Sequence, residues 1–129
     1  MDTLTGIWRL IASNAWDEHG MALPPPYGEK PIGQITFSCG RMLASLCNGD
    51  SNATAPMRAY TSYGGLYTFD GNILETVVDM ASDVGRIGSV QRREVTMEDA
   101  VMILRPPQRA YGADIQRREL SWEHVWQPQ

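Results

Sequence analysis

Hydrophobic and polar positions alternate along most of this chain, which is the period-two pattern of half-buried β-strands. In the last segment, Leu120, Trp122 and His124 fall on one face, and charged or hydroxyl side chains fall on the other. No segment combines apolar positions at helical spacing with capping residues at its ends. Eight segments are therefore predicted to be strands: 7–16, 33–38, 42–47, 63–69, 73–80, 89–97, 101–105 and 115–126.

The connections between these segments alternate between long and short. Residues 39–41, 70–72 and 98–100 are tight turns, whereas 17–32, 48–62, 81–88 and 106–114 are long loops. Alternate connections of an up-and-down barrel lie at the same end, so the long loops would surround one rim and the tight turns would close the other. The sequence predicts an all-β protein with an eight-stranded up-and-down antiparallel barrel, a cup with room for one small ligand. The alternative is a filled barrel or sandwich with loops that bind no ligand.

The length of 129 residues leaves room for this barrel alone, so we expect a single domain over residues 1–129. A composition of 43% hydrophobic and 20% charged residues is typical of a globular protein. No apolar run reaches the roughly 18 residues of a membrane span, and the first residues do not resemble a secretion signal. A net charge of −4 disfavours a nucleic-acid partner.

Cys39 and Cys47 are expected to be free thiols. One lies at a tight turn and the other at the far end of the next strand, roughly 20 Å away, which is beyond the reach of a disulfide. Free thiols and the missing signal favour a cytosolic protein. Two histidines, two cysteines and no cofactor-binding motif lead us to expect no metal and no cofactor.

Four stretches of the chain resemble one known family. Thr5-Gly6-Ile7-Trp8 resembles the Gly-x-Trp opening of lipocalins, and residues 27–35, continuing through Gly40-Arg41-Met42, are similar to the bacterial and fungal lipocalin-like domain family. Tyr63-Gly64-Gly65-Leu66-Tyr67 resembles the Tyr-x-Gly-x-Tyr strand of that family, and Val84-Gly85 with Gln91-Arg92-Arg93 resembles its next block. The resemblance covers about residues 4–126. It implies a calycin-type barrel that holds a small, mostly apolar molecule, although barrels of this shape also host cofactor-free isomerases and cyclases.

The sequence departs from the family pattern in two places. One is the arginine at the floor of the barrel, and the other is a histidine that could take part in catalysis. Lipocalins usually place an arginine after the final strand, over the opening tryptophan, but the last arginine here is Arg118, at the start of that strand. We therefore expect Trp8 to plug the floor with His124, Val125 or Trp126 as its neighbour. Related sequences often carry a histidine where residues 73–80 have none, which weakens a mechanism based on histidine.

The inward faces of the predicted strands supply the candidate site residues. Tyr63 and Tyr67 share a face, where they either pack in the core or orient a ligand. Arg118, in line with Leu120 and Trp122, either points inward and needs an anionic partner or lies in solvent. Of Arg92 and Arg93, the second is expected to point inward. The expected ligand-binding residues are Trp16, Leu46, Tyr63, Tyr67, Met80, Arg93, Arg118, Leu120 and Trp122.

Two functions fit this reading. The first is binding of a small, mostly apolar or aromatic molecule, with Arg93 or Arg118 at its polar end. The alternative is a cofactor-free isomerase, cyclase or lyase acting on a small hydrophobic substrate in the same cavity. Its acid would be Tyr63 or Tyr67, and Arg93 or Arg118 would stabilise an oxyanion, but no base is identified. His124 is expected to be a core residue rather than that base.

Other surfaces of the predicted barrel suggest where contacts form. Two loops at the open rim, 23–28 and 106–111, combine prolines with aromatic side chains and are typical of an entrance. Trp126 and the outer face holding Ile7 and Ile11 are a candidate contact surface for a homodimer.

Overall fold

A computed structural model describes residues 2–55, 57–111 and 114–129. The described residues form one antiparallel sheet, in which each long strand pairs with the next and β1 also pairs with β10. This closure confirms the predicted all-β, eight-stranded up-and-down barrel. The eight long strands are β1 (Gly6–Asp17), β3 (Pro31–Ser38), β4 (Arg41–Asn48), β5 (Thr61–Phe69), β6 (Ile73–Ala81), β7 (Val90–Glu98), β8 (Val101–Arg105) and β10 (Asp114–Trp126).

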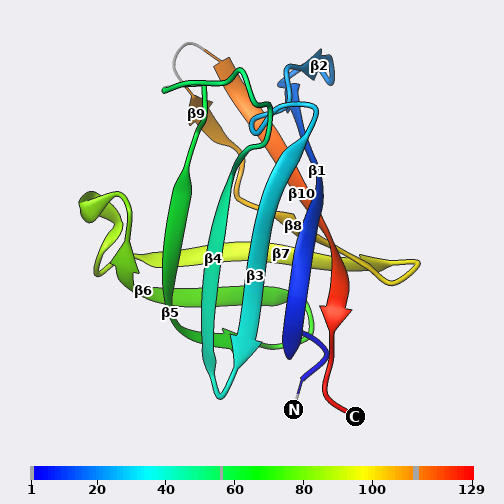
Figure 1. Cartoon of the computed structure of the whole chain (residues 1–129), viewed down its shortest axis with the longest axis vertical. Coiled ribbons are helices and arrows are strands. Elements are labelled where there is room, and N and C mark those ends of the chain that lie inside the picture. Colours follow the sequence, from blue (N-terminus) through cyan, green and yellow to red (C-terminus); the bar gives the residue numbers. More distant parts are fainter. Residues whose placement is uncertain (1, 56, 112–113) are drawn as a thin grey trace.

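Three smaller elements of the described structure lie within the long connections between the strands. The short strand β2 (Ala22–Leu23) pairs with β1, and β9 (Arg109–Tyr111) pairs with the start of β10. The 3-10 turn η1 (Val84–Arg86) lies between β6 and β7 and is the only helical segment in the described part of the chain. Figure 1 shows β2 and β9 at one end of the molecule, opposite the two termini and the β3–β4 turn. Residues 2–55, 57–111 and 114–129 contain no helix that is long and apolar enough to cross a membrane.

A β-bulge in β1 changes which of its side chains face the interior. The register against β10 shifts between Leu10 and Ala12. Leu10 is buried before the shift, and Ser13 and Ala15 are buried after it, so the inward face moves by one residue. Trp16 therefore lies on the opposite face from Ala15, and its expected place on the inner wall is wrong.

A second bulge has the same effect in β6. Gly64 pairs with Met80 and Gly65 pairs with Val78, which leaves Asp79 as the extra residue. Val78 is 1% exposed, but Met80 is 42% exposed. The expected inward orientation of Met80 is wrong because the extra residue turns its side chain to the outer surface.

Trp8 closes the floor of the barrel. Its ring is buried, and its Nε1–H donates a hydrogen bond to the carbonyl oxygen of Leu4 at 2.8 Å. Its cross-strand partner His124 stacks on the ring, with centroids 3.4 Å apart, so the structure selects His124 among the three expected neighbours. Both cysteines are free, as expected.

We predict that Trp8→Ala lowers the free energy of unfolding by about 3–5 kcal/mol, because it leaves a cavity at the floor. Trp126→Ala is the matched control, since that side chain is 56% exposed, and it should change stability by no more than about 0.5 kcal/mol. Urea unfolding followed by circular dichroism measures both variants. Equal losses would contradict the floor role of Trp8.

Candidate functional site

A cavity of about 660 Å³ opens among the long loops. Side chains of β4, β8 and β10 give it an apolar wall: Ala44, Leu46, Leu104, Leu120 and Trp122. The polar part of the lining consists mainly of tyrosines and arginines: Tyr27, Tyr63, Arg86, Arg92, Arg93, Arg109, Tyr111 and Arg118. A volume of a few hundred Å³ with a largely apolar wall suits a drug-sized molecule.

Strand alternation brings most of the expected residues to this cavity. In β10, Arg118, Leu120 and Trp122 share the inner face. Leu46 lies on the inner face of β4. Tyr63 lies directly across from Ala44 on the neighbouring strand and is 8% exposed. The structure thus gathers Leu46, Tyr63, Arg93, Arg118, Leu120 and Trp122 around one space.

The remaining expected residues lie elsewhere. Tyr67 shares the inner face of β5 but lies near the floor, where its ring meets Phe37 edge-on and its hydroxyl contacts the carboxylate of Asp2 at 3.0 Å. Met80 is on the outer surface. Trp16 lies opposite Arg117 and lines a neighbouring groove of about 500 Å³, to which Arg93 and Arg118 also contribute.

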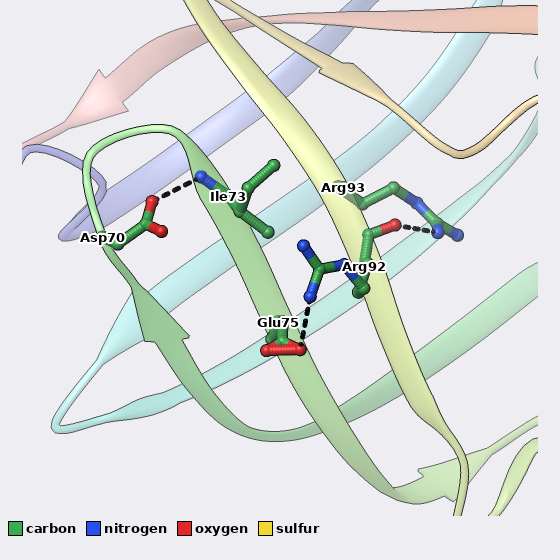
Figure 2. A network of polar contacts seen from close by, with 5 residues as sticks. All are labelled: Asp70, Ile73, Glu75, Arg92 and Arg93. Atoms are coloured by element: carbon green, nitrogen blue, oxygen red, sulfur yellow. Dashed lines mark hydrogen bonds and ion pairs between the residues drawn. The ribbon is translucent and has the colours of Figure 1, made fainter.

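The adjacent arginines of β7 point to opposite sides of the barrel wall (Figure 2). Both residues contribute to the cavity lining, but Arg92 donates to the carboxylate of Glu75 at 3.1 Å, whereas Arg93 donates to the carbonyl oxygen of Arg92 at 2.7 Å. Burial lowers the pKa of Arg93, because removing a guanidinium from water disfavours its charged form. Arginine nevertheless remains a cation at ordinary pH, so Arg93 brings a positive charge to the cavity.

Three other guanidinium groups at the cavity rest on tyrosine rings. Arg86 lies 4.3 Å from the ring centre of Tyr63, while Arg109 and Arg118 lie 4.5 and 3.5 Å from that of Tyr111. Burial lowers the pKa of Arg118, and its Nε–H donates to the side-chain oxygen of Gln116 at 3.2 Å. Contacts between cations and aromatic rings position these groups without neutralising their charge.

Several lining residues were not predicted, and the tyrosines and arginines that loops or short elements contribute are the most important of them. Tyr27 precedes β3, Arg86 belongs to η1, and Arg109 and Tyr111 belong to β9. Burial raises the pKa of Tyr27, and its backbone N–H donates to the hydroxyl of Ser13 at 3.1 Å. Alternation does not predict where loop side chains point. The sequence feature that could have identified the loop tyrosines is the presence of aromatic side chains in the two proline-containing loops of this rim.

The described lining of the cavity contains few groups that could act as a base. It holds no histidine, and its one carboxylate, Asp83, accepts a hydrogen bond from the backbone N–H of Gly85 at 3.0 Å. His19 lies in an exposed loop beside Glu18, and His124 lies at the floor. Across residues 2–55, 57–111 and 114–129, no cluster of His, Cys, Asp and Glu side chains could hold a metal ion.

The closed up-and-down barrel with one loop-lined cavity defines a calycin-type architecture. A family model described as a lipocalin-like domain matches residues 5–128. The chain therefore belongs to the lipocalin-like domain family, which confirms the resemblance seen in its motifs and suggests small-molecule binding in general terms. No curated protein and no solved structure matches the chain.

We predict that His124 makes stability depend on pH. Burial holds its pKa below the usual value near 6.5, so between those two pKa values the unfolded chain binds more protons than the folded one. Stability is therefore complete above about pH 6.5 and falls as pH decreases toward the folded pKa. Melting temperatures across this window should fall less in His124→Phe than in the wild type, whereas His19→Gln, an exposed control, should retain the full slope. Identical slopes in wild type and His124→Phe would contradict the assignment.

Proposed function

We propose that this protein binds a small, mostly apolar or aromatic molecule inside the barrel. The observation that carries the proposal is the cavity of about 660 Å³, in which apolar side chains share the lining with tyrosines and arginines. Burial of apolar ligand surface against Leu46, Leu120 and Trp122 would supply most of the affinity. The polar groups of the lining would set the orientation of the ligand.

Arg93 and Arg118 are the groups that would meet the polar end of the ligand. Both line the cavity, and both carry several N–H donors in a rigid fork. Tyr27 and Tyr63 add aromatic surface and a hydroxyl each. The free thiols of Cys39 and Cys47 support a cytosolic setting for this binding.

A cofactor-free isomerase, cyclase or lyase is the alternative function. Tyr27 favours it, because a phenol whose pKa is raised by burial stays protonated and can donate a proton inside the cavity. Arg93 would then stabilise an oxyanion. The described lining offers only Asp83 as a carboxylate, and binding needs no base, so binding is the function that the site supports better. Conversion of a bound molecule into product by the purified protein would establish the alternative.

The neutral fluorophore N-phenyl-1-naphthylamine, whose emission rises in apolar surroundings, tests the proposed function. We expect saturable binding of one molecule per chain. Leu120→Trp should weaken this binding by at least about ten-fold, because the larger ring occupies the cavity. Leu43→Trp, on the outer face of β4 at 46% exposure, is the matched control and should leave the affinity unchanged.

Two results would overturn this proposal. One is the absence of saturable one-to-one binding by the wild-type chain. The other is equal weakening by Leu120→Trp and Leu43→Trp, because the outer face would then matter as much as the cavity.

A further inference from the structure

We infer that the molecule bound in the cavity carries an anionic group, a carboxylate or a sulfonate, held by the guanidinium of Arg93 with Arg86 beside it. This inference rests on the proposed function and specifies the charge of the ligand's polar end. It comes from a contrast between the arginines on the two sides of the barrel wall.

In the described part of the chain, four of the five strand arginines on the outer face of the barrel have carboxylate partners, and the fifth, Arg117, lies over the ring of Trp16. Arg41 contacts Asp79 at 2.8 Å and Arg92 contacts Glu75 at 3.1 Å. Two further pairs join neighbouring strands in the same way, Arg9 with Glu123 and Arg105 with Glu119. These pairs neutralise four of the outer arginines.

The cavity arginines differ from this pattern. In the described part of the chain, no ion pair joins Arg86, Arg93, Arg109 or Arg118 to a carboxylate. The described lining of the cavity holds these four cations, together with the paired Arg92, against the single carboxylate of Asp83, although the whole chain has a net charge of −4. Positive charge is therefore concentrated at a concave site of a chain that is negative overall, and such a site attracts anions.

Arg93 is the centre of this group. One hydrogen bond is seen for its guanidinium, to the carbonyl oxygen of Arg92, although a guanidinium has five N–H donors. Besides burial, the nearby cations Arg86 and Arg109 lower its pKa, which places several positive charges close together. A partly buried cation without a counter-ion loses part of its hydration, and an anionic oxygen of the ligand would offset that loss.

The surroundings of Arg93 also limit the rest of the ligand. Leu120, Trp122 and Leu104 line the same cavity and offer apolar contact to a hydrocarbon or aromatic body. The planar fork of a guanidinium matches the paired oxygens of a carboxylate or sulfonate. The ligand class that fits both features is a small aromatic or aliphatic acid.

Two probes that differ by one sulfonate test the inference: 8-anilinonaphthalene-1-sulfonate and its neutral counterpart N-phenyl-1-naphthylamine. Fluorescence titrations are carried out on the full chain and on the variants Arg93→Gln and Arg41→Gln. Arg93→Gln should weaken binding of the sulfonate by about ten-fold and change that of the neutral probe by less than about two-fold, because only the anion uses the charge. Arg41→Gln, whose charge lies on the outer face with Asp79 and outside the described lining of the cavity, should leave both affinities unchanged.

Arg86→Gln is a second variant that tests the inference even if Arg93→Gln does not fold. It should also weaken binding of the sulfonate probe and leave binding of the neutral probe nearly unchanged. Melting curves establish that each variant is folded. If Arg93→Gln and Arg86→Gln both leave sulfonate binding unchanged while the neutral probe binds, the anionic ligand is refuted and the proposed function stands. If the wild-type chain binds neither probe at one site, the proposed function itself fails.

Discussion

The antiparallel pairing of β1 with β10 joins the two ends of the chain, and the rest of the structure depends on it. This pairing runs from Ile7 opposite Trp126 to Asp17 opposite Gln116. It removes the two sheet edges that an open eight-stranded sheet would expose and turns one face of every strand into an interior. The same pairing places His124 across from Trp8 at the floor and Arg118 across from Ala15 toward the open rim. Closure thus defines both a sealed end and a lined cavity.

Charge is distributed around this closed wall according to which face each strand residue occupies. Most outward arginines pair with carboxylates on nearby strands, as in the pair formed by Arg92 of β7 and Glu75 of β6. Inward positions of the upper barrel instead bring arginines together with tyrosine rings, as in the contact between Arg86 and Tyr63. Because strand alternation turns the side chains of Arg92 and Arg93 to opposite sides, the first pairs with Glu75 and the second adds to the cavity a positive charge that is unpaired in the described structure.

The cavity also explains why binding suits this protein better than acid–base catalysis. The histidines lie at the floor and in an exposed loop, away from the described lining. The lining supplies aromatic surface, an apolar wall and hydrogen-bond donors. Together these features recognise the shape and charge of a bound molecule. Membership in the lipocalin-like domain family agrees with a general role in binding small molecules.

The sequence by itself determined the number of long strands, their order and the end at which the long loops gather, because alternation and turn residues are local signals. It also predicted the floor role of Trp8 and the inward side of Tyr63, Leu120 and Trp122. Only the tertiary structure decided where Trp16 and Met80 point, because each follows a β-bulge whose extra residue reverses the alternation. It also brought Tyr27 and Arg86 to the cavity from separate loops, since their positions depend on closure of the barrel rather than on any local pattern of the chain.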